Sequence, residues 1–193
     1  FFLFAFIVGI FLMSILLMVQ LNSFYQVFII VSAVVLSTAG VQLGLLVTQQ
    51  ISSALFTSLG VIALAGIVVN NNIVLVDTYN VISKENPDLS RDQIVVRTAA
   101  QRLRPIILTT ATTVIGLLPL ASGIGVDFYQ RNIEIGGRVS EWWQPMSFAV
   151  VWGLTFASAL TLFLTPCWLM LPIAIRETFS NIKKTFLKTA SER

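Results

Sequence analysis

Residues 53–80 read SALFTSLGVIALAGIVVNNNIVLVDTYN, an apolar stretch long enough to cross a bilayer as a helix. Three consecutive amides, Asn70, Asn71 and Asn72, interrupt it before Asp77, the first charged residue of the chain. Hydrocarbon offers an amide no water, so polar groups at this depth usually face the protein interior or a wet path. The stretch therefore predicts a membrane-spanning helix with candidate functional residues at its centre.

The composition of the whole chain points to an integral membrane protein. Of the 193 residues, 56% are hydrophobic and 11% charged, whereas about a quarter are charged in a typical soluble domain. The first 19 residues have neither the basic n-region nor the small-residue cleavage site of a secretory signal. The chain also begins with Phe1 rather than Met, and we expect it to be a piece of a longer protein.

The residue inventory argues against an enzyme. There is no histidine, and the single cysteine, Cys167, lies in an apolar run beside Pro166. We therefore expect neither metal-ligand clusters nor a catalytic triad. The net charge of +3 does not indicate nucleic acid as a partner, because the basic residues flank the apolar segments, as membrane orientation requires.

Five apolar segments are long enough to span a membrane, which predicts an all-α, polytopic helix bundle. They lie near 1–19, 25–47, 53–80, 104–122 and 145–173. Small residues recur at a spacing of four, a pattern that lets helix backbones approach closely. The pairs are Ala5 and Gly9, Gly40 and Gly44, and Gly153 and Ala157.

The basic residues predict the orientation. Ten of the twelve fall in two regions separated by two spans, so both regions belong on one side: Lys84, Arg91, Arg97, Arg102 and Arg104, then Arg176, Lys183, Lys184, Lys188 and Arg193. By the positive-inside rule this side is the cytoplasm, which places the C-terminus there. We expect residues 174–193 to form a basic cytoplasmic tail.

The two longer connections have their own features. Ser90-Arg91-Asp92-Gln93 is typical of a capping box, and an amphipathic surface helix is expected over about 90–102, with Pro105 opening the next span. The connection 123–144 is expected outside, with Trp142 and Trp143 at the interface.

Polar residues share single faces of the third and fourth spans. Asn70 and Asp77 are seven residues apart and so lie on one face. In the fourth span one face carries Arg102, Thr109, Thr113 and Gly116. A carboxylate elsewhere could exchange protons along such faces. From the residues alone, the prediction is a polytopic bundle with a buried polar path, a transporter.

Simpler roles fit some of these side chains. We expect Thr110 and Thr112 to bond their own helix backbone, and Arg104 to anchor the helix end by snorkelling. For Asp77, solvation near a helix end and a functional role stay equally open.

Three ordered motifs resemble the resistance–nodulation–division (RND) exporters. GIVVNNNIVLVD at 66–77 is very similar to the GIVVNNAIVLVD motif of that family. RLRPIILTT at 102–110 and GLLPL at 116–120 resemble its next conserved stretch, and EWWQPM at 141–146 through LFLTP at 162–166 its last span. Together the motifs cover most of 51–172.

The resemblance implies the last five of twelve spans, in a superfamily whose membrane halves are also similar to sterol-sensing modules. It implies a proton-driven antiporter of the bacterial inner membrane, a homotrimer that works with a periplasmic adaptor and an outer-membrane channel. Protons would be the coupling ion, with no further cofactor. The family exports drugs, metals and hydrophobic compounds, and its selectivity resides largely in periplasmic domains outside this chain.

The resemblance also assigns residues. The family's proton-binding aspartates lie on its fourth span, outside this chain, and their relay partners match Asn70, Arg102 and Thr109. Other polar residues form a possible accessory path: Asn71, Asn72, Asp77 and Thr113. The drug-exporting branch has lysine at the place of Asn70, and an amide cannot form its ion pair, so Arg102 becomes the main cationic candidate.

Two other functions stay open. One is a related membrane module that assists protein or lipid movement, such as a secretion-assisting or sterol-sensing-like protein. The other is a stand-alone structural or sensory bundle, in which the amides only pack. A sharp, monodisperse species of this chain in detergent would favour the stand-alone bundle.

Overall fold

The computed structural model describes residues 2–49, 53–127 and 132–191. Five helices and one two-stranded antiparallel hairpin make up these ranges: α1 (Phe2–Leu21), α2 (Phe24–Thr48), α3 (Ala54–Glu85), α4 (Arg91–Ala121), β1 (Ile124–Asp127), β2 (Asn132–Ile135) and α5 (Arg138–Ser191). Each helix is long and apolar enough to cross a membrane. The prediction of an all-helical membrane bundle is confirmed, and the hairpin lies in the predicted connection 123–144.

The helix α4 corrects one sequence prediction. No separate surface helix ends before Pro105: α4 runs unbroken from Arg91 to Ala121 with Pro105 inside it. The predicted capping box at Ser90 and Gln93 is present. Val95 and Ile106, on either side of Pro105, are both buried against the same cluster from α2, α3 and α5. Neighbouring helices hold both halves in line, which is how membrane helices tolerate an interior proline.

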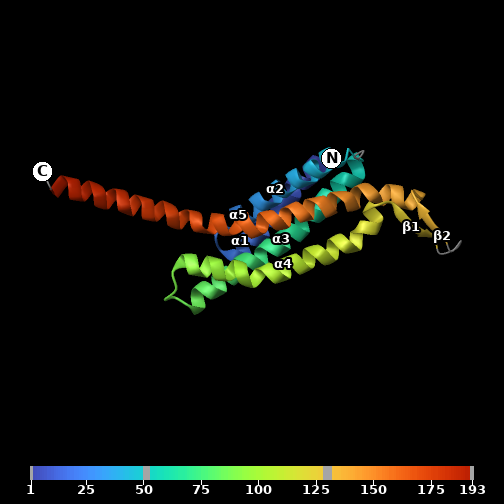
Figure 1. Cartoon of the computed structure of the whole chain (residues 1–193). Coiled ribbons are helices and arrows are strands. Elements are labelled where there is room, and N and C mark those ends of the chain that lie inside the picture. Colours follow the sequence, from blue (N-terminus) through green and yellow to red (C-terminus); the bar gives the residue numbers. More distant parts are fainter. Residues whose placement is uncertain (1, 50–52, 128–131, 192–193) are drawn as a thin grey trace.

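The helix α5 also extends beyond its predicted span. It continues through the expected tail to Ser191, a total of 54 residues, or about 80 Å at helical rise. Figure 1 shows this part (red) leaving the bundle at the end where α3 turns into α4, opposite the hairpin. The two basic regions therefore lie at the same end, as predicted. The side chains of the tail's basic residues lie outside those that the structure describes.

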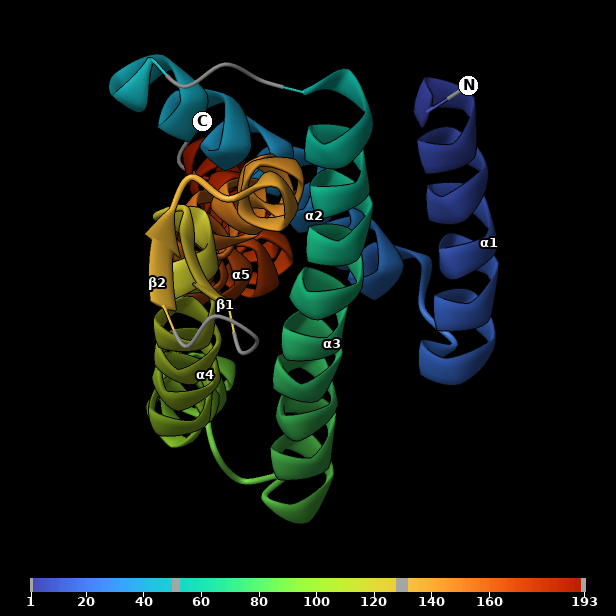
Figure 2. The same cartoon turned by 90° about the vertical axis from the view of Figure 1, so that its right-hand side faces the viewer.

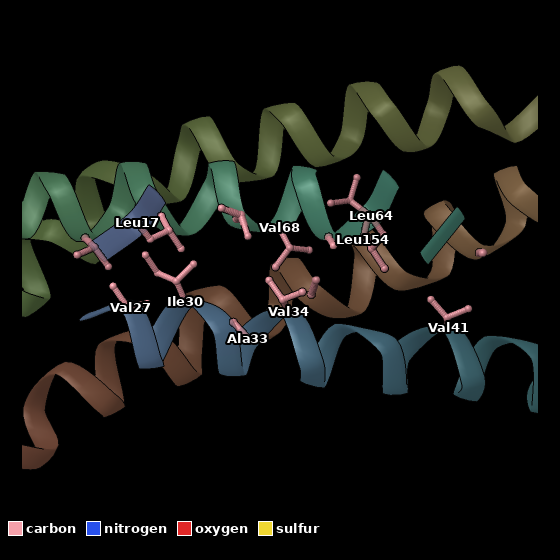
Figure 3. Close-up of a cluster of buried hydrophobic side chains, with 14 residues drawn as sticks. Leu17, Val27, Ile30, Ala33, Val34, Val41, Leu64, Val68 and Leu154 are labelled. Carbon is pink, nitrogen blue, oxygen red and sulfur yellow. The ribbon is translucent and has the colours of Figure 1, made fainter. Parts of the chain in front are cut away.

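The core forms where α2, α3 and α5 meet, with α1 at the edge. Figure 3 shows the cluster, in which Ile30 and Val34 of α2 meet Leu64 and Val68 of α3 and Leu154 of α5. In α1 the one buried residue is Leu17, and Figure 2 shows this helix standing beside α3 at the rim of the bundle. Most of α1 thus offers its apolar surface to lipid or to other protein.

Glycines set the close approach of α2 to α5. A Cβ at Gly40 would lie 2.5 Å from Cβ of Phe156, and one at Gly44 would lie 2.5 Å from Cγ of Trp152. A Cβ at Gly153 of α5 would come closer still to the side chain of Leu64 on α3. The predicted small-residue contacts are therefore present at these three positions. Gly9, by contrast, has nothing within 4 Å among the described residues.

Candidate functional site

The three adjacent amides have three different environments. Asn72 is fully buried with 0% exposure, Asn71 is partly buried and Asn70 is exposed. The reason is geometric, because successive residues of a helix point about 100° apart. One helix turn thus directs one amide into the bundle and another away from it, and the triplet does not act as a unit.

Asn72 joins α3 to α5. Its Nδ2 donates to Val68 O at 2.9 Å and to Thr161 Oγ1 at 3.2 Å, and its Oδ1 accepts from Thr165 Oγ1 at 2.9 Å. Both amide protons are therefore used, and all three partners are protein atoms. This arrangement satisfies a buried polar group and holds two helices in register. Asn72 serves as an interhelical contact, and the structure does not place it on an open path.

The partners of Asn72 were not among the residues predicted from the sequence. Thr161 and Thr165 are buried on α5, and Ser158 lies on the same face one turn earlier. Their spacing of three and four in an otherwise apolar span is the signal that could have identified them. Small hydroxyl residues at this spacing are typical of a face that bonds to a neighbouring helix.

Asn70 and Asp77 lie on a face of α3 that no described helix covers. Both are exposed, and so is Lys84, seven residues further on. Val74 (37% exposed) and Val81 (44%) lie between them on the same face. The predicted sharing of one face by Asn70 and Asp77 is thus confirmed, and the face extends to Lys84. We call it the open face of α3.

Arg102 forms a hydrogen bond to α3 beside this face. Its Nε donates to Thr78 Oγ1 at 2.5 Å, and Thr78 in turn donates to Val74 O at 2.7 Å. Arg102 is half-buried, and Thr78 follows Asp77 directly in the chain. The guanidinium is therefore held at the level of Asp77. The four N–H groups on its Nη atoms have no acceptor among the described residues.

The threonines of α4 behave in two ways. Thr109 and Thr113 bond carbonyls of their own helix, Ile106 O at 3.1 Å and Thr109 O at 2.8 Å. Thr112 does the same, as expected. Thr110 does not: its hydroxyl lies 2.6 Å from Ser158 Oγ of α5, and the expectation of backbone bonding is wrong there. Its position between two packed helices is the reason, because Ser158 offers a second hydroxyl within reach.

The three predicted relay residues do not contact one another in the part of the chain that the structure describes. Arg102 is bonded to Thr78, Thr109 to its own backbone, and Asn70 faces outward. Arg104 is exposed, which fits an anchor. Among the described residues, no group of three or more His, Cys, Asp or Glu side chains is placed to hold a metal ion.

Comparison with known proteins identifies the family. The model of the AcrB/AcrD/AcrF family matches residues 2–172, which is nearly the whole bundle. The chain belongs to this family. This is a family of RND efflux transporters, as the motifs at 66–77 and 102–120 indicated.

Individual relatives agree with this assignment. The chain is 32% identical over 149 residues to the multidrug resistance protein MdtC of Citrobacter koseri, and 31% identical over 152 residues to that of Escherichia coli. These alignments cover 76% and 77% of this chain but 13% of each relative. The chain thus spans about an eighth of the length of the curated relatives that it matches.

A solved structure shows the same arrangement of helices. The crystal structure of a heavy metal efflux pump superimposes with a TM-score of 0.66 and 30% sequence identity. The match covers 84% of this chain and 15% of the pump. The helices of this chain are therefore arranged like one segment of a much larger efflux pump.

Proposed function

We propose that this chain is the C-terminal membrane portion of a proton-driven RND antiporter and supplies part of its proton relay. The observation that carries the proposal is the open face of α3, with Arg102 fixed beside it. Asn70 is an exposed amide at membrane depth, and lipid would leave it unsatisfied. This face therefore needs a polar cover, from other protein or from water.

The remainder of the same transporter is the proposed cover. Arg102 uses one of its five N–H donors on Thr78, which leaves the planar pair of Nη groups for a carboxylate. A carboxylate from another span would pair with this fork when ionised and release it when protonated. If this carboxylate takes up its proton from the outside and releases it to the cytoplasm, its contact with Arg102 switches between two states. Coupling to a proton gradient requires a switch of this kind.

Asn70 and Thr109 have secondary roles in this proposal. Asn70 has no charge to lose or gain, so it stabilises the incoming carboxylate by hydrogen bonding in both protonation states. Thr109 bonds Ile106 O in this structure and needs only a rotamer change to offer its hydroxyl to the path. The switch itself therefore depends on the cation, Arg102. We propose protons as the coupling ion, with no other cofactor.

The proposed setting follows the family. The protein would lie in the bacterial inner membrane with Arg193 in the cytoplasm, as a homotrimer that works with a periplasmic adaptor and an outer-membrane channel. Two of the solved or curated relatives are named for multidrug resistance and for heavy metal efflux. The substrate is therefore either a hydrophobic compound or a metal ion.

The test compares three variants in the complete transporter: Arg102→Ala, Arg102→Lys and Arg104→Ala. Cells expressing each variant are loaded with ethidium or with Zn²⁺, and efflux is followed with and without a protonophore. We expect Arg102→Ala to abolish the protonophore-sensitive efflux and Arg102→Lys to retain part of it. Arg104→Ala is the matched control, because Arg104 is exposed on the same helix, and it should export normally.

Protein level in the membrane is measured for every variant. Protonophore-sensitive efflux that survives in Arg102→Ala, at normal protein level, would overturn the role of Arg102. Efflux by the unmodified transporter that is indifferent to the protonophore would overturn proton coupling itself.

A further inference from the structure

The open face of α3 ends in a polar hollow at the basic end of the bundle. The hollow lies between α3 and the turn from α1 to α2, and water can enter about 490 Å³ of it. That is room for on the order of ten water molecules. Its polar lining includes Gln20, Asn22, Gln26, Asp77, Asn80 and Lys84.

The amides of this hollow are held in fixed positions. Gln26 Nε2 donates to Asn80 Oδ1 at 2.7 Å, and Asn80 Nδ2 donates back to Gln26 Oε1 at 3.1 Å. Each amide keeps one N–H and one lone pair for a further partner. The pair ties α2 to α3 and leaves a hydrogen-bonding wall that suits water. Lipid tails could not satisfy such a wall.

The polar lining of the hollow reaches well inside the helix α3 and is not confined to its end. Asp77 lies eight residues before Glu85, the last residue of α3, or about 12 Å along the helix. Elsewhere on the bundle a hollow along α5 is almost wholly apolar, lined by Phe156, Leu160 and Phe163 among others. That surface suits lipid. The hollow at Asp77 is instead lined by polar side chains, and it opens at the end where both basic regions lie.

Asp77 is the one acidic group among the described residues that line the hollow. It has no hydrogen-bond or ion-pair partner among the described residues. The charged group that shares the lining is Lys84, two turns away on α3, while the described parts of α1 and α2 contribute amides and Ser23. On the side of α4, Arg102 is bonded to Thr78. Asp77 thus lines a polar hollow beside the proposed relay, with no fixed counter-ion among the described residues.

We propose that this hollow is the water-filled mouth through which the proton leaves the relay, and that Asp77 accepts and passes on that proton. The proposal rests on the proton-driven antiport above and adds the exit. A hydronium ion in the path transfers a proton to the Asp77 carboxylate, which becomes a neutral carboxyl group. The carboxyl group then loses this proton to water in the hollow and regains its charge, so no net charge stays behind. Bond making and breaking involve only O–H bonds.

The first experiment tests the hollow independently of transport. In the complete transporter with Cys167→Ser, single cysteines replace Asp77, Asn80 or Ile62. Inverted membrane vesicles are then treated with a membrane-impermeant cationic methanethiosulfonate. We expect labelling at positions 77 and 80. Ile62 is exposed on the same helix but does not line the hollow, so Ile62→Cys should stay unlabelled.

Two outcomes of the labelling count against the proposal. An unlabelled Asp77→Cys with a labelled Asn80→Cys would exclude Asp77 from the wet space. Labelling of Ile62→Cys as fast as that of Asp77→Cys would show general access along α3 and no defined mouth.

The second experiment tests the carboxylate. Asp77→Asn and Asp77→Glu are compared in proteoliposomes in which the cytoplasmic pH is varied at a constant gradient, with ethidium or Zn²⁺ as the probe. Asp77→Asn is expected to slow export by about tenfold or more, since a positioned proton acceptor is lost, and to flatten its dependence on cytoplasmic pH. Asp77→Glu, which restores the carboxylate, should recover both the rate and the pH profile.

Different experimental results would contradict this inference and the proposed function. If Arg102→Ala abolishes export while Asp77→Asn keeps the normal rate and pH profile, the antiport stands and the exit is elsewhere. If Arg102→Ala still exports by a proton gradient, the relay is wrong. A slow Asp77→Asn with an unchanged pH profile would show that Asp77 has only a structural role.

Discussion

Thr165 donates a hydrogen bond to Asn72 Oδ1 across 2.9 Å, and this contact joins α5 to α3 in the middle of the bundle. The same amide donates to Thr161, so one side chain of α3 bonds two turns of α5. The family motif quoted above has alanine at this place. This chain thus adds a polar interhelical contact where that motif has an apolar one, and it satisfies the added amide completely.

Asn72→Ala is expected to destabilise the packing of α3 against α5. It removes two interhelical hydrogen bonds, each worth about 0.6–1.7 kcal/mol in a membrane, so we expect a loss of about 1–3 kcal/mol. SDS titration of the detergent-solubilised complete transporter, followed by circular dichroism, measures this loss. The control is Thr112→Ala, because Thr112 is exposed and bonds only carbonyls of its own helix. Equal stability of Asn72→Ala and the unmodified protein would contradict the role of Asn72.

Gly40→Ala and Gly153→Ala are expected to disturb the packing on α5. The new methyl group at 40 would lie 2.5 Å from Cβ of Phe156, which is not the movable end of a side chain. Overpacking of this kind costs about 1–3 kcal/mol. Thermal stability in detergent is the measurement. Gly9→Ala and Gly116→Ala are matched helix controls with nothing within 4 Å among the described residues, and they should remain as stable as the parent.

Thr78→Val is expected to impair export without removing Arg102. The change keeps the shape of the side chain but deletes the acceptor of the Arg102 Nε–H group. A charge-assisted hydrogen bond is worth about 1.5–3 kcal/mol, so the guanidinium should leave its present orientation and export should fall by about tenfold. Efflux of ethidium or Zn²⁺ is the measurement. Thr78→Ser, which keeps the hydroxyl, should export normally, and a defect of the same size in both variants would refute this explanation.

Thr110 and Ser158 are expected to be energetically coupled. Their hydroxyl oxygens lie 2.6 Å apart and join α4 to α5. A double-mutant cycle with Thr110→Val and Ser158→Ala should show a coupling of about 0.6 kcal/mol, the average for such bonds in a membrane protein. Thr112→Val serves as the control, because Thr112 bonds only its own helix. Strict additivity of the Thr110 and Ser158 changes would show that the hydroxyl contact contributes nothing.

The sequence predicted most of the fold because a membrane span needs about 20 apolar residues, and that signal is local. Each of the five segments corresponds to one helix of the structure. The capping box at Ser90 and the shared end of the two basic regions were equally readable, since each follows from neighbouring residues or from a count of spans. The motifs at 66–77 and 102–120 likewise identified the family.

The continuity of α4 through Pro105 could not be predicted from such local signals. A proline is tolerated in the first turn of a helix, and this favoured a helix start at Pro105. The burial of Val95 and Ile106 in one cluster explains why the helix continues through it.

By itself the sequence determined the spans, their order and which residues share a helix face, because helical periodicity depends on the chain alone. Tertiary structure decided which face meets protein. It buried Asn72 between α3 and α5, left Asn70 uncovered, bonded Arg102 to Thr78 and formed the polar hollow around Asp77. Three adjacent asparagines are chemically identical, and only the position of the neighbouring helix distinguishes them. The approach of α5 to α3 is set by close packing at Gly60 and Gly153, whose contact partners lie far away in the chain.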